Sequence, residues 1–355
     1  MTDRERFLRT MRYQDVDRVP YWEMGPWPET RQRWETEIPL CKDTPVPTDK
    51  HQWISSWFFP NPPFEHKVIS EDERTITYVN HEGIVIKERK DNPYSSMPQF
   101  VKFPVETPAE FRTFWKERMN PDMVARLGAD WIAKLEGLRN RDYPIALIAD
   151  RWGGFFGSLR NLMGVENLCM TFYDDPAFVE EMMDCVADFM IAVMDQVLDH
   201  MEVDTFGFWE DMAYKTAPLI SPAMVRKYMF PRYRRVCDFL YKRGVEFISL
   251  DSDGDMASLI SIWMDAGINV LYPFEVQCGM DVNKVRKEYG KDLRIWYGMD
   301  KRAIAAGPNA IDIEVKRVAP LIRDGGYLPG PDHSYPPDIS YENYVYFTKK
   351  LFEAL

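Results

Sequence analysis

Residues 246–273, EFISLDSDGDMASLISIWMDAGINVLYP, carry the pattern that decides the fold class. The apolar run Glu246–Leu250 predicts a strand, and the acidic DSDGD segment after it opens an amphipathic helical stretch. Gly267 stands where that helix should end, and Asn269–Pro273 predicts the next strand. A strand, a helix and a second strand in this order form the unit from which parallel sheets and barrels are built.

The same alternation runs along most of the chain and predicts a parallel sheet or barrel. Helix starts are marked by an N-cap residue followed by proline at Thr107, Asp175 and Ser221. The seven predicted strands are Arg18–Met24, Pro144–Ala149, Asp204–Trp209, Glu246–Leu250, Asn269–Pro273, Leu293–Tyr297 and Gly326–Leu328. A barrel needs an eighth strand, which the sequence does not locate.

One region departs from the alternation. Ile69–Lys90 predicts two strands around Val79–Gly83, which is typical of a β-hairpin inserted after the first strand. The preceding segment, Cys41–Pro63, is rich in proline and aromatic residues and predicts a long functional loop or lid. We expect residues 1–355 to form a single domain that carries an inserted loop and hairpin at about 41–103.

The composition excludes several classes of protein. The formal net charge of −12, with no basic tract, opposes binding to nucleic acid or to an anionic membrane surface. The five cysteines form no CxxC pair and are odd in number, so free thiols in a reducing compartment are expected. Neither a signal peptide nor an apolar stretch of about 20 residues is present. We expect a cytoplasmic protein.

Carboxylates collect at the ends of the predicted strands, where a barrel places its chemistry. They are Glu23, Asp150, Glu210 with Asp211, Asp251 with Asp253 and Asp255, Glu275, Asp300, and Asp332 beside His333. Asp150, Asp255 and Asp300 fit helix N-caps. Like charges around one mouth raise each other's pKa and persist when a cation, a metal or a proton compensates them.

Two acidic loops are the sharpest local motifs. The loop that starts at Asp251 resembles the first half of a calcium loop, but Leu259 and Ile262 stand where further ligands would be required. It is therefore either a capped turn or a binding loop of another kind. The second loop, Leu328–Asp338, is stiffened by proline and contains His333, which either binds a ligand or bonds to the backbone.

Two other segments stand at predicted strand ends. In Trp152–Arg160, WGGFFGSLR, the glycines allow a close approach to a ligand and the aromatic residues form an apolar wall, or the segment packs a helix tightly on a strand. Tyr214 and Lys215 follow Glu210, and Lys215 either pairs with neighbouring acids or binds a substrate anion.

Several motifs, taken in order, resemble those of the uroporphyrinogen decarboxylase superfamily over nearly the whole chain. They are Arg4–Leu8 with Asp17–Pro20, Gly157–Gly164 with Asp174–Pro176, Ile220–Pro222, and Gly325–Tyr327 before the Pro-Pro-Asp loop. The resemblance implies a (β/α)8 TIM-type barrel, commonly a homodimer. It also implies either cofactor-free decarboxylation of a tetrapyrrole or zinc-dependent methyl transfer that involves a corrinoid protein or a thiol.

The tetrapyrrole reaction is disfavoured by charge. Its substrate carries many carboxylates and requires arginine or lysine, which authentic decarboxylases place just after the first strand. Here Trp22–Thr30 is acidic and aromatic instead. A decarboxylase of a smaller, less anionic substrate, with Asp251 as the acid, is the alternative, and a non-catalytic protein that captures a cation is a third reading.

The methyltransferase branch is the leading interpretation. Its members bind zinc through a His-x-Cys motif and a late Cys, and the matching positions here are Asp251, Asp253 and His333, with Glu275 or Glu210 to complete the set. Such ligands accept Zn²⁺ and also Mn²⁺, Fe²⁺ or Mg²⁺. We expect a metal-dependent methyltransferase or demethylase that moves a methyl group from a small substrate, such as a methoxy-aromatic compound, to a separate corrinoid protein.

The expected site residues follow from this reading. The catalytic candidates are Asp251, Glu210, Lys215 and Tyr214. The substrate-binding candidates are Glu23, Trp27, Trp152, Phe155, Arg160 and Trp209. The aromatic rings among them would stack on an aromatic substrate or surround a methylammonium group.

Overall fold

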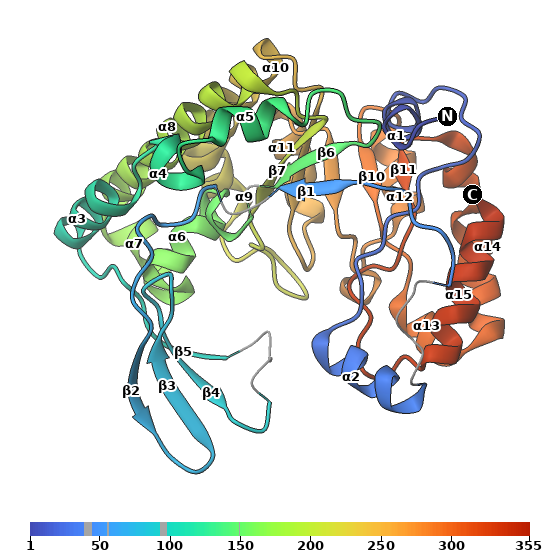
Figure 1. The fold of residues 1–355 in the computed structure, drawn as a ribbon, viewed down its shortest axis with the longest axis horizontal. Coiled ribbons are helices and arrows are strands. Elements are labelled where there is room, and N and C mark those ends of the chain that lie inside the picture. The colour runs from blue at the N-terminus through green and yellow to red at the C-terminus, as the bar shows by residue number, and fades with distance from the viewer. Residues whose placement is uncertain (39–44, 55–56, 93–97, 149) are drawn as a thin grey trace.

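The computed structural model describes residues 1–38, 45–54, 57–92, 98–148 and 150–355. Its centre is a parallel sheet with the strand order β1-β6-β7-β8-β9-β10-β11 (Figure 1). The strands are β1 Gln52–Ile54, β6 Ile145–Ile148, β7 Thr205–Trp209, β8 Phe247–Asp251, β9 Val270–Tyr272, β10 Arg294–Trp296 and β11 Tyr327–Leu328. The predicted parallel α/β barrel architecture is therefore confirmed.

Six of the seven predicted strands are present, and the exception is Arg18–Met24. This segment joins no ladder, because Pro20 has no N–H to donate and the backbone of Tyr21 bonds instead to Asp49, through N to Oδ2 at 2.8 Å and through O to the Asp49 amide at 3.0 Å. The first strand of the sheet is β1, which lies inside the predicted loop Cys41–Pro63 and pairs with β6.

Large aromatic side chains fill the interior of the barrel. Trp53 of β1, at one edge of the sheet, meets Trp296 of β10 with ring centroids 6.2 Å apart, so the sheet curls around on itself. Trp22 contacts both rings, and Phe7 of α1 (Asp3–Met11) stacks on Trp22 at 5.0 Å. The N-terminal helix therefore packs into the barrel core, and the segment that was predicted as a strand contributes a core side chain.

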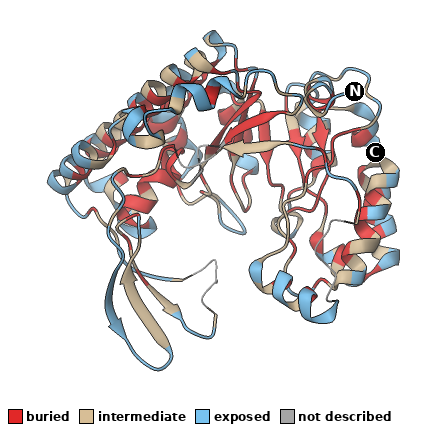
Figure 2. Cartoon of the chain, viewed as in Figure 1, coloured by how far each residue is buried: buried red, intermediate tan, exposed pale blue. Residues whose placement is uncertain are grey.

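Helices cover the outer face of the sheet, and Figure 2 shows buried residues concentrated on the strands and on the helix faces turned toward them. The predicted N-caps Thr107, Asp175, Ser221 and Asp300 are confirmed, each accepting from a backbone amide. The remaining helices are α2 Pro28–Glu37, α3 Pro108–Arg118, α4 Met123–Leu127, α5 Trp131–Glu136, α6 Phe156–Met163, α7 Val165–Asp174, α8 Pro176–His200, α9 Pro222–Met224, α10 Phe230–Lys242, α11 Ile260–Ala266, α12 Val282–Tyr289, α13 Lys301–Ala306, α14 Pro308–Asp324 and α15 Tyr341–Ala354.

The insertion is larger than the predicted hairpin. β3 (Thr75–Val79) and β4 (Val85–Arg89) form the expected hairpin, and β2 (Lys67–Glu71) and β5 (Gln99–Lys102) extend it to a four-stranded antiparallel sheet, β2-β3-β4-β5. Figure 1 shows this sheet projecting away from the barrel strands.

Four cysteines are free, namely Cys169, Cys185, Cys237 and Cys278, and Cys41 lies outside the described residues. Among the described helices, none combines the length and apolar character required to cross a bilayer.

Candidate functional site

The loops that follow β8 and β11 bring two predicted ligands together. His333 Nε2 lies 3.6 Å from Asp253 Oδ2, and 27% and 37% of the two side chains are exposed. The ring of Trp27, at the start of α2, meets the His333 ring edge-on with centroids 6.0 Å apart. Trp27 is held there by its amide, which donates to the Tyr335 carbonyl at 3.1 Å. Three residues that are distant in sequence thus meet at the carboxyl ends of the strands.

The hydrogen bonds around His333 assign its protons. The Ser334 amide donates to Nδ1 at 2.8 Å, so Nδ1 carries a lone pair and the hydrogen of the neutral ring sits on Nε2, toward Asp253. Burial lowers the pKa of His333, but the contact and the negative charge of Asp253 outweigh this, and the net pKa is raised. The pair therefore favours a ring that holds a proton at Nε2.

Lys301, the first residue of α13, occupies the middle of the acidic cluster. Its Nζ lies 3.2 Å from Glu275 Oε1 and 3.5 Å from Asp332 Oδ1. Asp332 is almost completely buried, and burial raises its pKa. Sequence reasoning missed Lys301, because a lysine just after an N-cap aspartate is typical of an exposed helix start. The available signal was its position, because Lys301 directly follows Asp300, the N-cap of a helix that begins at the end of a strand.

The predicted zinc ligands do not fit a metal site in this arrangement. Among the described residues, no group of three His, Cys, Asp or Glu side chains is placed to hold a metal ion. Glu275 is held by Lys301 and by the Gly254 amide at 3.0 Å, and Nε2 of His333 points its hydrogen at Asp253. In a metal-binding imidazole, one ring nitrogen presents a lone pair to the metal and the other donates its N–H to a neighbouring acceptor. In His333 the nitrogen that faces the acidic cluster, Nε2, carries the hydrogen, and Nδ1 accepts from a backbone amide.

Glu23 and Asp251 flank Tyr297, which follows β10. Burial raises the pKa of the Tyr297 hydroxyl, and the negative charges of Asp251 and Glu23 raise it further. Glu23 accepts from Tyr21 Oη at 2.7 Å and from Tyr344 Oη at 2.9 Å, and burial raises its pKa. Asp251 is the last residue of β8, and both acids lie within electrostatic range of Tyr297.

Glu210 has a different place from the one predicted. It is completely buried and accepts from the amides of Phe155 at 2.7 Å and Gly157 at 3.0 Å and from the hydroxyl of Tyr233. Burial raises the pKa of Glu210 to about 7, against the effect of these hydrogen bonds. Glu210 thus satisfies the first amides of α6 in the layer between the sheet and the helices. Phe155 lies in the same layer, with its ring 6.1 Å from Phe208.

Trp152, a predicted substrate-binding residue, makes contacts that hold the inserted sheet to the barrel. Its buried indole donates to Glu82 Oε1 at 2.9 Å and stacks on Phe114 at 5.8 Å. Glu82 lies in the turn between β3 and β4, so this bond fastens the inserted sheet to the barrel.

Arg160 and Trp209 form a second, smaller group at the end of β7. The guanidinium of Arg160 binds the Asp211 carboxylate at 2.6 Å and lies 4.5 Å from the centre of the Trp209 ring. Tyr214 is exposed in the loop that follows, and Lys215 beside it is exposed and makes no ion pair within the described part of the chain. The predicted site residues thus divide among several places. Asp253 pairs with His333, Glu275 pairs with Lys301, Glu23 and Asp251 act on Tyr297, Arg160 contacts Trp209, and Glu210 and Phe155 lie in the helix–sheet layer.

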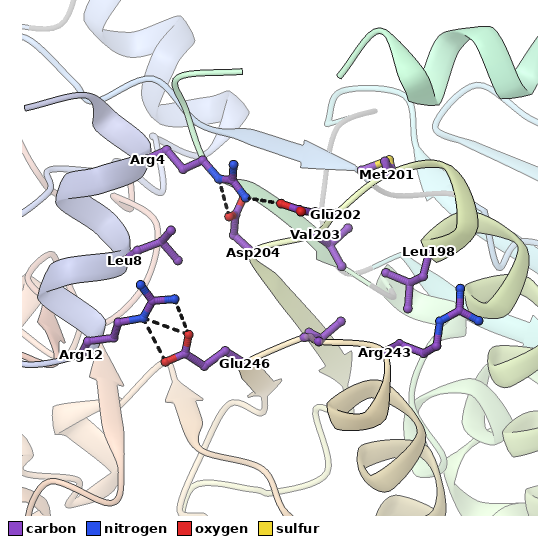
Figure 3. Close-up of a pocket in the computed structure, with 12 residues that line it drawn as sticks. Arg4, Leu8, Arg12, Leu198, Met201, Glu202, Val203, Asp204, Arg243 and Glu246 are labelled. Carbon is purple, nitrogen blue, oxygen red and sulfur yellow. Dashed lines mark hydrogen bonds and ion pairs between the residues drawn. The ribbon is translucent and has the colours of Figure 1, made fainter. Parts of the chain in front are cut away.

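A cavity of about 280 Å³ lies at the opposite end of the barrel, where β7 and β8 begin (Figure 3). Among its charged side chains, Arg4 pairs with Asp204 at 2.8 Å and Arg12 with Glu246 at 2.6 Å. The amino-terminal end of a barrel generally serves stability, and these pairs tie α1 to the strand starts.

A family model described as uroporphyrinogen decarboxylase (URO-D) matches residues 148–353. The chain belongs to the uroporphyrinogen decarboxylase family. No curated protein matches the sequence. Among solved structures, a methyltransferase from Methanosarcina mazei covers 99% of each chain with a TM-score of 0.62 and 15% identity, which shows a shared fold. A B12-independent methionine synthase from Shewanella sp. W3-18-1 covers 82% of this chain and 73% of its own, with 9% identity and a TM-score of 0.41, too weak to support an inference.

The family match and the site overlap only in part. The matched residues of this uroporphyrinogen decarboxylase family member include the loops that carry Asp253, Lys301 and His333. Glu23, Trp27 and the inserted sheet lie before residue 148, outside the match. The expectations of a homodimer and of a corrinoid partner stay predictions.

Proposed function

We propose that this member of the uroporphyrinogen decarboxylase family is a methyltransferase that removes a methyl group from a small substrate and passes it to an acceptor on a separate corrinoid protein. The observation that carries the proposal is the Asp253–His333 pair, which stands beside Trp27 at the strand ends. The name of the Methanosarcina mazei structure with the same fold supports the same class of reaction.

The pair supplies what a methyl donor requires. When a methyl–oxygen or methyl–nitrogen bond breaks toward a nucleophile, the methyl carbon bonds to the nucleophile and the electron pair of the broken bond stays on oxygen or nitrogen. For a methyl ether, a proton delivered to the oxygen makes the leaving group neutral, whereas a methylammonium group releases a neutral amine without it. His333 can supply such a proton from Nε2 when its ring is charged, and Asp253 stabilises that charged ring. Charging the ring places a second hydrogen on Nδ1 and breaks the bond that Nδ1 accepts from the Ser334 amide.

The surrounding charges define the substrate class. Glu23 and Asp251 are carboxylates that both act on Tyr297 just past β10, so the site favours a neutral or cationic molecule and opposes a polyanion. Arg160 is already paired with Asp211. Trp27 offers a ring face or edge for a methoxy-aromatic or methylammonium substrate. These features support methyl transfer over decarboxylation of a tetrapyrrole.

The test uses purified protein with free reduced cobalamin as the acceptor and panels of methoxy-aromatic compounds and methylamines. Methyl transfer changes the visible spectrum of the cobalamin. His333→Gln and Asp253→Asn are expected to lower kcat by about 10²-fold or more, the usual contribution of a positioned acid. His200→Gln is the matched control, because His200 also lies 3.6 Å from a carboxylate, Glu136, but at the end of α8.

Three results would contradict the proposal. One is release of CO₂ from a carboxylated substrate without methyl transfer, which indicates a lyase. Another is ligand binding that raises Tm without turnover of any panel member, which indicates a binding protein. The third is an equal loss of activity in the His200 and His333 variants.

A further inference from the structure

Lys301 is a buried lysine next to the residues that the family resemblance implied as metal ligands, and it pairs with one of them, Glu275. About a tenth of its side chain is exposed, and its two carboxylate partners, Glu275 and Asp332, are similarly shielded, with 12% and 1% of their side chains exposed. Buried charges persist when they are paired, and a single ammonium serves both acids here.

Each of these carboxylates also accepts from a backbone amide of a neighbouring loop. Glu275 Oε2 accepts from Gly254 at 3.0 Å, and Gly254 directly follows Asp253. Asp332 Oδ2 accepts from Val276 at 2.9 Å, and its Oδ1 accepts from the Lys301 amide at 3.1 Å. Together these bonds join the loops that follow β8, β9, β10 and β11 around one ammonium group.

The two members of the candidate acid pair stand at either end of this network. Asp253 is next to Gly254, which Glu275 holds, and His333 is next to Asp332. Each carboxylate is held in part by the Lys301 ammonium. A displacement of Glu275 or Asp332 would therefore alter the 3.6 Å separation between Asp253 and His333.

The ammonium and a divalent metal would compete for the same oxygens. A metal bound to Glu275 and Asp332 would lie within about 4 Å of Nζ unless the lysine moved, and two cations at that distance in a shielded site repel strongly. The lysine is covalently attached, so no loss of translational freedom opposes its pairing.

We infer that Lys301 is a built-in cation that takes the place of a divalent metal, keeps metals out of this acidic cluster, and positions Asp253 and His333 through Glu275 and Asp332. The positioning role rests on the proposed function, whereas the exclusion of metal does not. Lys301 is a positioning residue, because it acts through the two carboxylates.

The first experiment measures metal binding to the full chain. Wild-type protein, treated with EDTA and dialysed, is titrated with Zn²⁺ and Mn²⁺ by calorimetry and analysed for metal content. We expect less than about 0.1 equivalent to remain bound and no rise in Tm on adding metal, because the ammonium already occupies the oxygens of both carboxylates. One equivalent bound to the wild type, and lost in Glu275→Gln, would overturn the inference.

The second experiment removes the ammonium. Lys301→Met keeps the aliphatic stem and exposes two carboxylates, so we expect metal binding to appear and Tm to rise by several degrees with Zn²⁺. Lys301→Met combined with Glu275→Gln should lose that gain, and it keeps the test available if the single variant does not fold. The matched control is Lys291→Met, because Lys291 also lies 3.2 Å from a carboxylate, Asp324, but on the surface.

The third experiment tests positioning. In the methyl-transfer assay, Lys301→Met should lower kcat at least tenfold with little change in KM, and Lys301→Arg should recover part of kcat. Equal kcat in Met and Arg variants would contradict a positioning role. If the wild type transfers no methyl group, the proposed function fails, whereas the metal titrations still decide whether Lys301 excludes metal.

Discussion

Glu210 provides the sharpest quantitative test of the structure. It is completely buried in the helix–sheet layer, and its pKa is raised from 4.5 to about 7. The folded protein therefore binds this proton more tightly than the unfolded chain does. By linkage, the stabilising contribution of the neutral carboxyl is present below the unfolded pKa and is lost as the pH rises toward 7.

The magnitude follows from the two pKa values. A difference of 2.5 pH units, obtained from 4.5 and about 7, corresponds to about 3 kcal/mol over the full titration, and about 2 kcal/mol of this falls between about pH 5 and pH 7. Glu210→Gln removes the ionisable group. We therefore expect the stability of the variant relative to the wild type to rise by about 2 kcal/mol across that interval.

The assay is urea unfolding at several pH values, followed by tryptophan fluorescence. The comparison of wild type with variant cancels the titration of the other groups. Glu117→Gln on α3, an exposed position, controls for the loss of a surface carboxylate. A constant difference between wild type and Glu210→Gln from pH 5 to pH 7, or a difference of opposite sign, would refute the assignment of Glu210 as a buried, proton-binding cap of α6.

Two further predictions concern the supports of the site. Gly154→Ala should lower the free energy of unfolding in urea by about 3 kcal/mol or more, because its Cβ would lie 1.8 Å from the Trp209 carbonyl oxygen. Gly279→Ala, in open space at φ +87°, is the control and should lower it by only about 1 kcal/mol. Equal losses in the two variants would contradict this prediction. Glu82→Ala should lower the free energy of unfolding by about 1–3 kcal/mol, because it leaves the buried Trp152 indole N–H without an acceptor. Amide hydrogen exchange should also become faster in β2–β5. Unchanged exchange would show that this bond does not fasten the inserted sheet.

Much of the fold follows from local signals in the sequence. Strand runs such as Asn269–Pro273 and caps such as Thr107 depend on residues within a few positions of one another, so the sequence predicts them directly. β1 was missed because three residues carry little periodicity. Its place is fixed by pairing with β6, more than 90 residues away.

The candidate site was predictable only where the barrel rule applies. That rule brings strand-end residues to one mouth, and it correctly places Asp253 near His333. The rule does not say which way a side chain turns. The side chains of successive residues point to opposite faces of a strand, so neighbouring residues at a strand end face different sides. The side chain of Glu210 faces the helix–sheet layer and not the mouth.

The sequence by itself therefore determines a parallel barrel with an inserted antiparallel hairpin and an acidic set of strand ends, because periodicity, caps and composition are local properties. Only the tertiary structure decides how that acidity is balanced. Lys301, Glu275 and Asp332 lie on three different loops and meet only in the folded protein. Ion pairs and hydrogen bonds act over a short range, so the pairing of these acids with a lysine depends on how the loops are placed in space.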